Sequence, residues 1–594
     1  MKKLLWLCAG LLLSTAVPAE DPRVSRGSGG AVASEEANAA RVGIEILKKG
    51  GNATDAAVAM SFALAVTWPE AGNLGGGGFW LSRDPSGKVL VVDSREVAPR
   101  EARRDLYIRP NARGIVPSAT EGPLATGVPG TVAGLALAHR RGGRLRWRDL
   151  VEPAIRLARD GFVMTENTSA SIAWNRERLL RDPETARIFL PGGAAPAPGS
   201  TFRQPDLAAT LTAIRDRGED GFYRGSVARS IEEGQRRQGG LISRGDLARY
   251  EARVRLPVHV RFADSDVVTT PAPSSGPALA EMVLLATLVG PEKLRARDVS
   301  SAHFAAEIEK RAFRDRNRYL GDPSFGGVRQ NLFTDPIRLR AIAKSIRPDR
   351  ATATEALRGA ESDKPSTTHF SIVDSAGGAV SVTTTLNDSF GNARVAPGLG
   401  FLWNDEMDDF ATRPGQKNMY GLVQGKVNAV APGKRMLSAM CPIIVVTGGK
   451  VAFVWGTPGG STIPTTNFQV LLGTLLRHET LEAAVAAPRF HQQDLPDTVQ
   501  YERGRFEPDW IEGLRRLGHT VVERDDGIYK SGLMGRVHGI ARNPDGSWTA
   551  VADPRRSGAG LVVHAAGASL VATPGGAGLV VTPASAGAVV RPTP

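Results

Sequence analysis

The sequence predicts an α+β fold, and three observations support this prediction. Apolar residues recur at helical spacing through most of residues 127–346, whereas short alternating runs typical of strands dominate after residue 366. A polar stretch over residues 347–366 separates the two regions and is predicted to be an exposed linker. The 594 residues are 42% hydrophobic and 23% charged, which supplies enough apolar material for a large core. Helices and strands that are segregated along a chain are typical of α+β folds.

Two helices are predicted near the start of the chain. Residues 35–49 carry apolar side chains at helical spacing, with Ser34 as the expected N-cap and a glycine pair at the end. Residues 54–66 are apolar nearly all round and stop before Pro69. This second helix is therefore expected to be fully buried.

Four consecutive glycines follow, in the stretch NLGGGGFWL at residues 73–81. They lead into a predicted strand whose partner is residues 89–93. Consecutive glycines can cradle a phosphate, but the Lys-Ser/Thr pair of a P-loop does not follow them. Close packing of backbone segments is therefore the expected role of these glycines.

The remaining elements follow the same two periodicities. Helices are predicted, with a strand-like break at 254–268, over residues 150–160, 207–215 and 302–320. Strands are predicted over residues 368–374, 379–386, 443–446 and 450–455. Residues 558–594 are rich in Ala, Gly, Val, Pro and Ser and are predicted to form a low-complexity extension.

The first residues, 1–19, predict a secretory signal peptide. Two lysines precede an apolar run over residues 4–13, and small residues follow at the expected cleavage positions. Lipidation at Cys8 is disfavoured because Trp and Leu precede it. No later segment reaches the roughly 18 to 20 apolar residues that a membrane helix requires. We therefore expect a periplasmic or secreted protein with no membrane segment after signal removal.

Composition also limits the chemistry. Cys441 is the only cysteine after the signal, so no intramolecular disulfide is expected, and its apolar neighbours predict a buried side chain. The nine histidines are scattered without a metal-binding spacing, and we expect no metal and no other cofactor. The net charge of +13 is spread over single arginines and short clusters, which predicts a solvated basic surface and no nucleic-acid partner.

A hairpin that begins with threonine carries the functional prediction. In the stretch KPSTTHFSIV, at residues 364–373, alternate residues share one face of a predicted strand. The turn at residues 375–378 folds the chain back, which brings Thr367 within about two residues of Thr385 or Asn387 on the partner strand.

Two interpretations of this hairpin are open. Thr and Ser are good strand formers, and for an arbitrary Ser-Thr-Thr that property alone explains the pattern. Alternatively, cleavage of the preceding bond makes Thr367 an N-terminal nucleophile. Its own α-amine, with an ordinary pKa of about 7.7 to 8.0, would then act as the base beside the hydroxyl.

A series of motifs between about residues 31 and 556 favours the second interpretation. In order, they read GGNATDAAVA, EAGNLGGGGF, DSREVAP, GVPGTVAG, TTHFSIVD, TTTLNDSFG, NDEMDDF, GKRMLSAM and GTPGGS. With them the sequence resembles the γ-glutamyltransferase (γ-glutamyltranspeptidase, glutathione hydrolase) family of N-terminal nucleophile hydrolases. The resemblance implies autocatalytic cleavage between Ser366 and Thr367 into a large subunit, residues 20–366, and a small subunit, residues 367–594, which stay together. It also implies a four-layer αββα sandwich formed jointly by the two subunits, in agreement with the α+β prediction.

The resemblance further implies roles for single residues. Thr367 is the expected nucleophile, Thr385 its hydrogen-bond partner, and the backbone amides of Gly459 and Gly460 the oxyanion hole. The implied substrate-binding residues are Arg95 and Ser438 for the α-carboxylate of the γ-glutamyl group, Asn387, Glu406 and Asp409 for its α-ammonium group, and Tyr420 on a lid loop over residues 414–425. Read singly, these residues have plainer explanations, such as a surface arginine, a solvated acidic turn or a glycine turn. The ordered set is what favours the family.

One position departs from the family pattern. Two adjacent serines are common at the carboxylate site, whereas this chain has Ser438 followed by Ala439. We therefore expect weaker binding of γ-glutamyl donors than two hydroxyl groups would give. The missing hydroxyl also leaves open an acylase that acts on a glutaryl-like group.

The implied activity is transfer of the γ-glutamyl group of glutathione and related compounds through an acyl-threonine, to water or to amino acid or dipeptide acceptors. Two alternatives remain. A cephalosporin or glutaryl acylase on the same scaffold is mildly favoured by Ala439. An uncleaved, non-enzymatic scaffold protein is disfavoured because Thr367, Thr385 and both oxyanion glycines are present.

Overall fold

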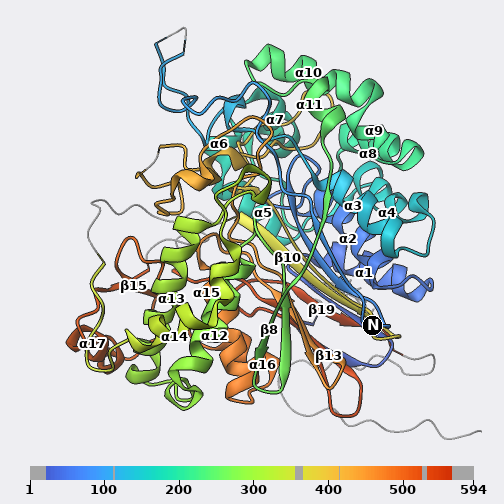
Figure 1. Ribbon diagram of the computed structural model, residues 1–594. Helices are drawn as coiled ribbons and strands as arrows, with labels where there is room; N and C mark the ends of the chain where they lie inside the picture. Colours follow the sequence, from blue (N-terminus) through green and yellow to red (C-terminus); the bar gives the residue numbers. More distant parts are fainter. Residues whose placement is uncertain (1–21, 112–113, 355–365, 414, 525–531, 565–594) are drawn as a thin grey trace, which may run out of the picture.

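Two seven-stranded sheets lie face to face in the middle of the molecule, with helices on both outer faces (Figure 1). The computed structural model describes residues 22–111, 114–354, 366–413, 415–524 and 532–564. The layers follow the predicted order αββα. The expected signal peptide, residues 355–365 of the expected linker and residues 565–594 of the expected extension lie outside the described residues.

The strands of each sheet come from widely separated parts of the chain. Sheet A has the order β1 (Val24–Gly27), β18 (Trp548–Ala552), β17 (His538–Arg542), β13 (Lys450–Gly456), β12 (Ile443–Thr447), β9 (Ser265–Thr269) and β8 (Val258–Phe262). Sheet B has the order β19 (Ala559–Val562), β2 (Gly30–Ser34), β10 (Ser366–Asp374), β11 (Ala379–Asn387), β3 (Gly77–Arg83), β4 (Val89–Asp93) and β7 (Arg253–Arg255). Both sheets combine strands from before and after Thr367, so the two expected subunits build each sheet together.

Small and β-branched side chains make up most of the apolar cluster between the sheets. Ala31 and Val373 from sheet B meet Val268, Ile444 and Ile540 from sheet A in one buried cluster. Such side chains suit the close spacing of two packed sheets, because the strands can approach without voids.

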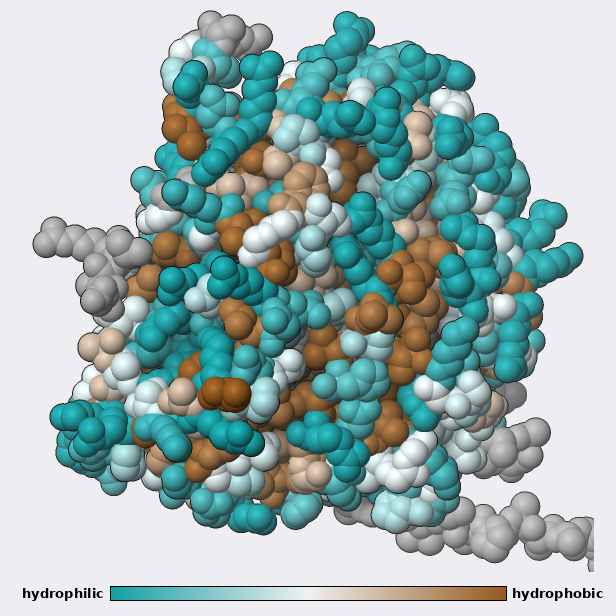
Figure 2. All heavy atoms as spheres, viewed as in Figure 1, coloured by the Kyte–Doolittle hydropathy of each residue, from teal (hydrophilic) through white to brown (hydrophobic). Residues whose placement is uncertain are grey.

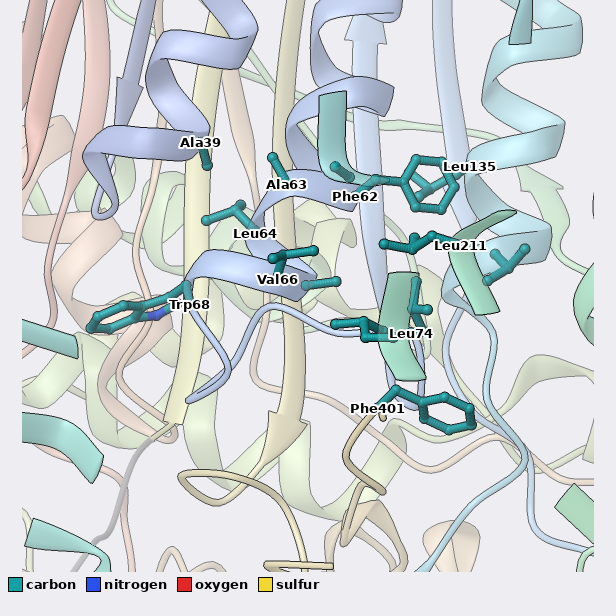
Figure 3. Packing of buried hydrophobic residues seen from close by; sticks show 14 of the residues in the cluster. Ala39, Phe62, Ala63, Leu64, Val66, Trp68, Leu74, Leu135, Leu211 and Phe401 are labelled. Carbon is teal, nitrogen blue, oxygen red and sulfur yellow. The ribbon is translucent and has the colours of Figure 1, made fainter. Parts of the chain in front are cut away.

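One helical layer covers the outer face of sheet B. It contains α1 (Ala37–Lys48), α2 (Ala53–Thr67), α3 (Thr131–Gly142), α4 (Trp147–Arg159), α8 (Pro205–Arg217) and α10 (Gly225–Gln238). Every residue of α2 is buried, as the sequence predicted. Figure 3 shows Phe62, Leu64 and Val66 of α2 among the apolar side chains of this cluster.

The other helical layer covers the outer face of sheet A. It contains α12 (Gly276–Val289), α13 (Val299–Tyr319), α14 (Pro336–Lys344), α15 (Thr462–Leu471), α16 (Leu481–Ala486) and, packed on α13, α17 (Pro508–Arg516). Cys441, just before β12, is buried in the apolar cluster that joins sheet A to these helices, as predicted.

Most predicted element ends are shifted by one to three residues, and two differences change the role of a segment. Ser34 does not cap α1, because it is the last residue of β2 and pairs with Phe370; the carboxylate of Glu36 caps the helix by accepting from two backbone N–H groups. The segment after Gly558 begins with a strand, since β19 pairs with β2 at the edge of sheet B. The fold therefore continues to Val562, beyond the expected start of the extension.

The shorter elements connect these layers. They are α5 (Glu166–Trp174), α6 (Arg176–Leu179), α7 (Pro183–Phe189), α9 (Asp220–Tyr223), α11 (Arg244–Arg249), β5 (Phe162–Val163), β6 (Thr201–Phe202), β14 (Phe490–His491), β15 (Val499–Tyr501) and β16 (Val521–Glu523). On the face drawn in Figure 2, hydrophilic side chains cover most of the surface. Within the described part of the chain, no helix combines the length and apolar character needed to cross a bilayer.

Candidate active site

The β10–β11 hairpin places Thr367 directly opposite Thr385. The sequence left a choice between Thr385 and Asn387, and the register resolves it: Ser366 pairs with Asn387, and a bulge between Ser366 and Thr367 leaves one extra residue on β11. Asn387 ends β11 with φ of +81°, a left-handed conformation that asparagine tolerates better than most residues. A bulge of this kind re-aims side chains at the end of a strand, where functional sites are common.

The two threonine hydroxyl groups lie close together in a buried setting. Thr367 Oγ1 lies 3.4 Å from Thr385 Oγ1, and both residues are only 3% exposed. Thr385 Oγ1 also accepts the backbone N–H of Asn387 at 2.7 Å. This bond fixes the rotamer of Thr385, so its hydroxyl is held facing Thr367.

The glycines of residues 75–78 lead into β3, which pairs with β11 in the same sheet and places Gly77 opposite Thr385. A Cβ atom on Gly76 would lie 2.1 Å from the carbonyl oxygen of Thr385, and one on Gly78 would lie 2.4 Å from that of Thr383. Asn73 donates to the Thr385 carbonyl oxygen at 2.9 Å. The prediction of close backbone packing is confirmed, and the glycines let β3 support the strand that carries Thr385.

Arg95 lies in a fully buried cluster with three carboxylates. Its guanidinium group contacts Glu406 at 2.5 Å, Asp409, and Glu96 at 3.3 Å. Burial alone would lower the pKa of Arg95, but the surrounding carboxylates outweigh it and raise that pKa. Burial also raises the pKa of Glu406 and Asp409, and Arg95 opposes this rise. The structure thus brings together three of the residues that the resemblance assigned to substrate recognition.

Asn387 and Tyr420 form a second pair from the expected substrate site. The hydroxyl of Tyr420 lies 2.6 Å from Asn387 Oδ1 and 2.9 Å from its carbonyl oxygen. Asn387 Nδ2 donates to the carbonyl oxygen of Asp405 at 3.0 Å, one residue before Glu406. The expected lid loop is therefore joined through Tyr420 to the end of β11.

Ser438 is buried, and its backbone is linked through Ser275 to a second arginine that the sequence did not predict. Ser275 donates to the carbonyl oxygen of Ser438 at 2.6 Å, and Arg316 Nε donates to Ser275 Oγ at 2.7 Å. Burial lowers the pKa of Arg316 to about 10, while nearby Asp409 raises it. Ala439 packs into the apolar cluster beneath sheet A.

Gly459 and Gly460 follow β13 in a turn that only glycine fits well. Gly459 has φ of +141° and Gly460 has φ of +55°. A Cβ atom on Gly459 would lie 2.5 Å from Thr462 Oγ1. Arg536 connects this turn to the strand that carries Thr367. Its backbone N–H donates to Thr457 Oγ1 at 2.8 Å, and its side chain donates to the carbonyl oxygen of Thr367 at 3.1 Å.

Sequence reasoning missed several residues that shape this site. Arg536 and Arg316 lie outside the quoted motifs, so no local signal marked them. Asn404 lies inside the motif NDEMDDF and could have been found there: its side chain bonds the backbone of Gly75 and Gly127 and accepts the N–H of Glu406. Among the described residues, no group of three or more His, Cys, Asp or Glu side chains is arranged to hold a metal ion.

The chain matches known proteins along almost its whole length. The family model described as Gamma-glutamyltranspeptidase matches residues 39–563. The glutathione hydrolase proenzyme of Pseudomonas aeruginosa is 43% identical over 546 residues, which are 90% of this chain and 95% of that protein. The glutathione hydrolase proenzyme of Escherichia coli is 39% identical over 535 residues, which are 89% of this chain and 91% of that protein.

Solved structures agree with the fold. A cephalosporin acylase from Bacillus halodurans superposes with a TM-score of 0.81 at 26% identity, covering 94% of this chain and all of that chain. A gamma-glutamyltranspeptidase chain from Pseudomonas nitroreducens, in complex with L-DON, has a TM-score of 0.51 at 40% identity and covers 55% of this chain and 96% of that chain. These likenesses confirm the four-layer N-terminal nucleophile hydrolase fold that the sequence predicted. The chain belongs to the gamma-glutamyltranspeptidase family of enzymes.

Proposed function

We propose that this protein is a self-processing γ-glutamyltransferase that hydrolyses glutathione and related γ-glutamyl compounds. The observation that carries the proposal is the pairing of Thr367 with Thr385 at the bulged start of β10. The names of the relatives from Pseudomonas aeruginosa and Escherichia coli, both glutathione hydrolase proenzymes, support the substrate and the processing.

Maturation begins when Thr367 Oγ attacks the carbonyl carbon of Ser366. The C–N bond between the two residues breaks, an ester to Thr367 Oγ forms, and the Thr367 nitrogen becomes an amine by taking up a proton. Water then hydrolyses the ester, which gives a carboxylate on Ser366 and restores the Thr367 hydroxyl. The products are chains 20–366 and 367–594, which stay together because both contribute strands to each sheet.

Turnover uses the same hydroxyl group on a γ-glutamyl amide. The α-amine of Thr367 accepts the hydroxyl proton as Oγ attacks the γ-carbonyl carbon, and it passes that proton to the leaving amine. The backbone amides of Gly459 and Gly460 stabilise the oxyanion, and losing one such donor typically costs about a hundredfold or more in rate. Water, an amino acid or a dipeptide then attacks the acyl-threonine ester and releases glutamate or a new γ-glutamyl amide.

The charge arrangement explains why an α-amino acid group is recognised. A γ-glutamyl donor carries an α-carboxylate and an α-ammonium group on one carbon. Arg95 offers a planar guanidinium for the carboxylate, and Glu406 and Asp409 offer anions for the ammonium. When the donor binds, its carboxylate pairs with Arg95 and its ammonium group pairs with Glu406 and Asp409. These contacts replace the direct ion pairs between Arg95 and the two carboxylates, so no buried charge is left unpaired.

A second candidate is an acylase for a glutaryl-like side chain. Ala439 removes one hydroxyl group from the carboxylate site, and the full-length likeness to a cephalosporin acylase supports the same scaffold for that reaction. A glutaryl group lacks the α-ammonium, so it would leave Glu406 and Asp409 without a cationic partner from the substrate. This cost favours the γ-glutamyl donor.

A direct comparison of two substrates tests the choice. The mature protein is incubated with γ-glutamyl-p-nitroanilide and with glutaryl-p-nitroanilide under identical conditions. We expect a kcat/KM at least about tenfold higher for the γ-glutamyl compound. A preference for the glutaryl compound would reverse the assignment, and no release from either would leave only the scaffold alternative. Export through the expected signal peptide belongs to the same proposal and is checked by finding the processed protein outside the cytoplasm.

A further inference from the structure

Arg536 contacts three segments of the chain: the start of β10 and the residue after β2, both in sheet B, and the residue after β13 in sheet A. It lies two residues before β17, in the sheet that does not contain Thr367. Its guanidinium group donates to the carbonyl oxygen of Thr367 at 3.1 Å and lies 2.7 Å from Glu35 Oε1. Its backbone N–H donates to Thr457 Oγ1 at 2.8 Å, next to the glycine turn of the expected oxyanion hole.

The position of Arg536 follows from where β2 ends. β2 pairs with β10 only from Phe370 to Asp374, and its last residue is Ser34. The next residue, Glu35, is held in the core and points its carboxylate at Arg536. The residues of β10 before Phe370 therefore do not pair with β2. Beyond the end of β2, the side chain of Arg536 donates a hydrogen bond to the Thr367 carbonyl oxygen instead.

We propose that Arg536 is a positioning residue that holds Thr367 for both self-cleavage and turnover. The inference rests on the proposed function of Thr367 as the nucleophile. Before cleavage, the peptide bond to Ser366 restrains Thr367 on its N-terminal side. After cleavage that restraint is gone, and the carbonyl group of Thr367 is the backbone anchor nearest to the reactive hydroxyl and amine. A donor fixed on that carbonyl limits rotation of the residue and keeps both groups oriented.

The surrounding charges hold Arg536 itself in place. Glu35 also lies 3.5 Å from Arg556, and Arg556 pairs with Glu70 at 3.1 Å. Burial raises the pKa of Glu35 to about 7, while the guanidinium groups of Arg536 and Arg556 act to lower it. The result is a buried network of two acids and two arginines in which Arg536 carries the contact to the nucleophile and Arg556 carries contacts to Asn167, Glu35 and Glu70.

The test compares Arg536→Met, Arg536→Lys and the control Arg556→Met, each in the full chain. Maturation is followed by intact mass over time, and kcat and KM for γ-glutamyl-p-nitroanilide are measured on the matured fraction. We expect Arg536→Met to slow maturation and to lower kcat by about tenfold to a hundredfold, with KM changed by less than about threefold. Arg536→Lys should recover part of both rates, because it keeps the charge and one donor. Arg556→Met, which disturbs the same acids, should keep kcat within about threefold.

The outcomes separate this inference from the proposed function. Wild-type maturation and kcat in Arg536→Met would overturn the positioning role while leaving Thr367 as the nucleophile. Equal losses in Arg536→Met and Arg556→Met, without recovery in Arg536→Lys, would reduce Arg536 to a structural residue. If Arg536→Met shows no cooperative unfolding transition, Arg536→Gln decides. Its amide reaches only as far as the arginine Nε and lacks the Nη2 group that donates to Thr367, so wild-type rates in that variant would overturn the inference. An uncleaved wild type would instead contradict the proposed function.

Discussion

Ala439 is the residue at which this chain departs from the family pattern, and its surroundings define what the departure means. Ser438 beside it is buried, and its backbone is held by Ser275. Ala439 itself packs with apolar side chains. One hydroxyl donor is therefore available at the expected carboxylate site where the family commonly has two.

Restoring that hydroxyl should tighten donor binding. A hydrogen bond to a charged group is worth roughly 1.5 to 3 kcal/mol, and about 1.4 kcal/mol corresponds to a tenfold change in affinity. We expect Ala439→Ser to lower the KM for γ-glutamyl-p-nitroanilide by about one to two orders of magnitude. The matched control removes the neighbouring hydroxyl: Ser438→Ala should raise the same KM. An unchanged KM in Ala439→Ser would contradict the expectation that the missing hydroxyl weakens donor binding.

At this scale the sequence predicts contacts that are close along the chain and misses those that are not. The pairing of Thr367 with Thr385 follows from the length of one hairpin turn, so the strand pattern brought it within two residues. The contact between Arg536 and Thr367 spans 169 positions and depends on how two sheets stack. No periodicity or turn signal encodes that distance.

At the scale of elements, the expected lid loop is held by a few polar contacts to the end of β11 and to the acidic segment that precedes the loop. Tyr420 contacts Asn387, and Asp408 Oδ2 accepts the backbone N–H of Met419 at 2.8 Å. Gln493 donates to the carbonyl oxygen of Tyr420 at 3.1 Å. The loop is thus tied to residues that the proposal places around the γ-glutamyl group.

Removing the Tyr420 hydroxyl should loosen this connection. Tyr420→Phe keeps the ring in its apolar surroundings but deletes the hydrogen bond to Asn387. Asn387 has a positive φ, so its backbone conformation depends on such contacts. We expect kcat/KM for γ-glutamyl-p-nitroanilide to fall about tenfold. The control Tyr501→Phe makes the same change in the cluster around α17 and should leave kcat/KM near the wild-type value. Equal values for the two variants would contradict a role for the lid contact.

Asp408, which accepts a hydrogen bond from Met419 of the expected lid loop, should make the free energy of unfolding depend on pH. Burial raises the pKa of Asp408 to about 7, whereas an unfolded aspartate has a pKa of about 3.9. The folded state therefore binds this proton more tightly, and the stabilising contribution is full below about pH 4 and is lost as pH rises through about 7. Asp408→Asn keeps an oxygen acceptor for Met419 but does not titrate.

The free energy of unfolding of Asp408→Asn, relative to the parent protein, should therefore increase as pH rises from about 4 to about 8. Denaturant titrations in the uncleaved Thr367→Ala background measure it at several pH values, and other titrating groups cancel in the difference. A difference between the two proteins that stays constant over this range would contradict the buried, protonated Asp408.

Elements were predicted well where apolar periodicity is strong. They were predicted poorly where a segment becomes a strand only by pairing with a distant strand. The all-round apolar pattern of residues 54–66 predicted a buried helix, which is α2. The strand β19 has the sequence Ala-Gly-Leu-Val and lies in an Ala- and Gly-rich region, so composition suggested an extension. It becomes a strand because β2 offers an open edge, which only the assembled sheet reveals.

At the scale of the whole molecule, the two expected subunits share both sheets and cannot separate without breaking strand pairs. β10 and β11, after the expected cleavage point, pair with β2 and β3, which precede it. Cleavage at Ser366–Thr367 therefore changes the chain connectivity while both halves stay in one core. We expect the matured protein to elute as one species of unchanged size in gel filtration, and separation of the two chains without denaturant would contradict this.

The central claim is that Thr367 makes itself an N-terminal nucleophile, and intact mass with N-terminal sequencing tests it most directly. The wild type and a Thr367→Ala variant are purified in the same way. The proposed mechanism predicts two chains from the wild type, the smaller beginning Thr-Thr-His-Phe, and one uncleaved chain from the variant. A single uncleaved chain from both proteins would contradict it.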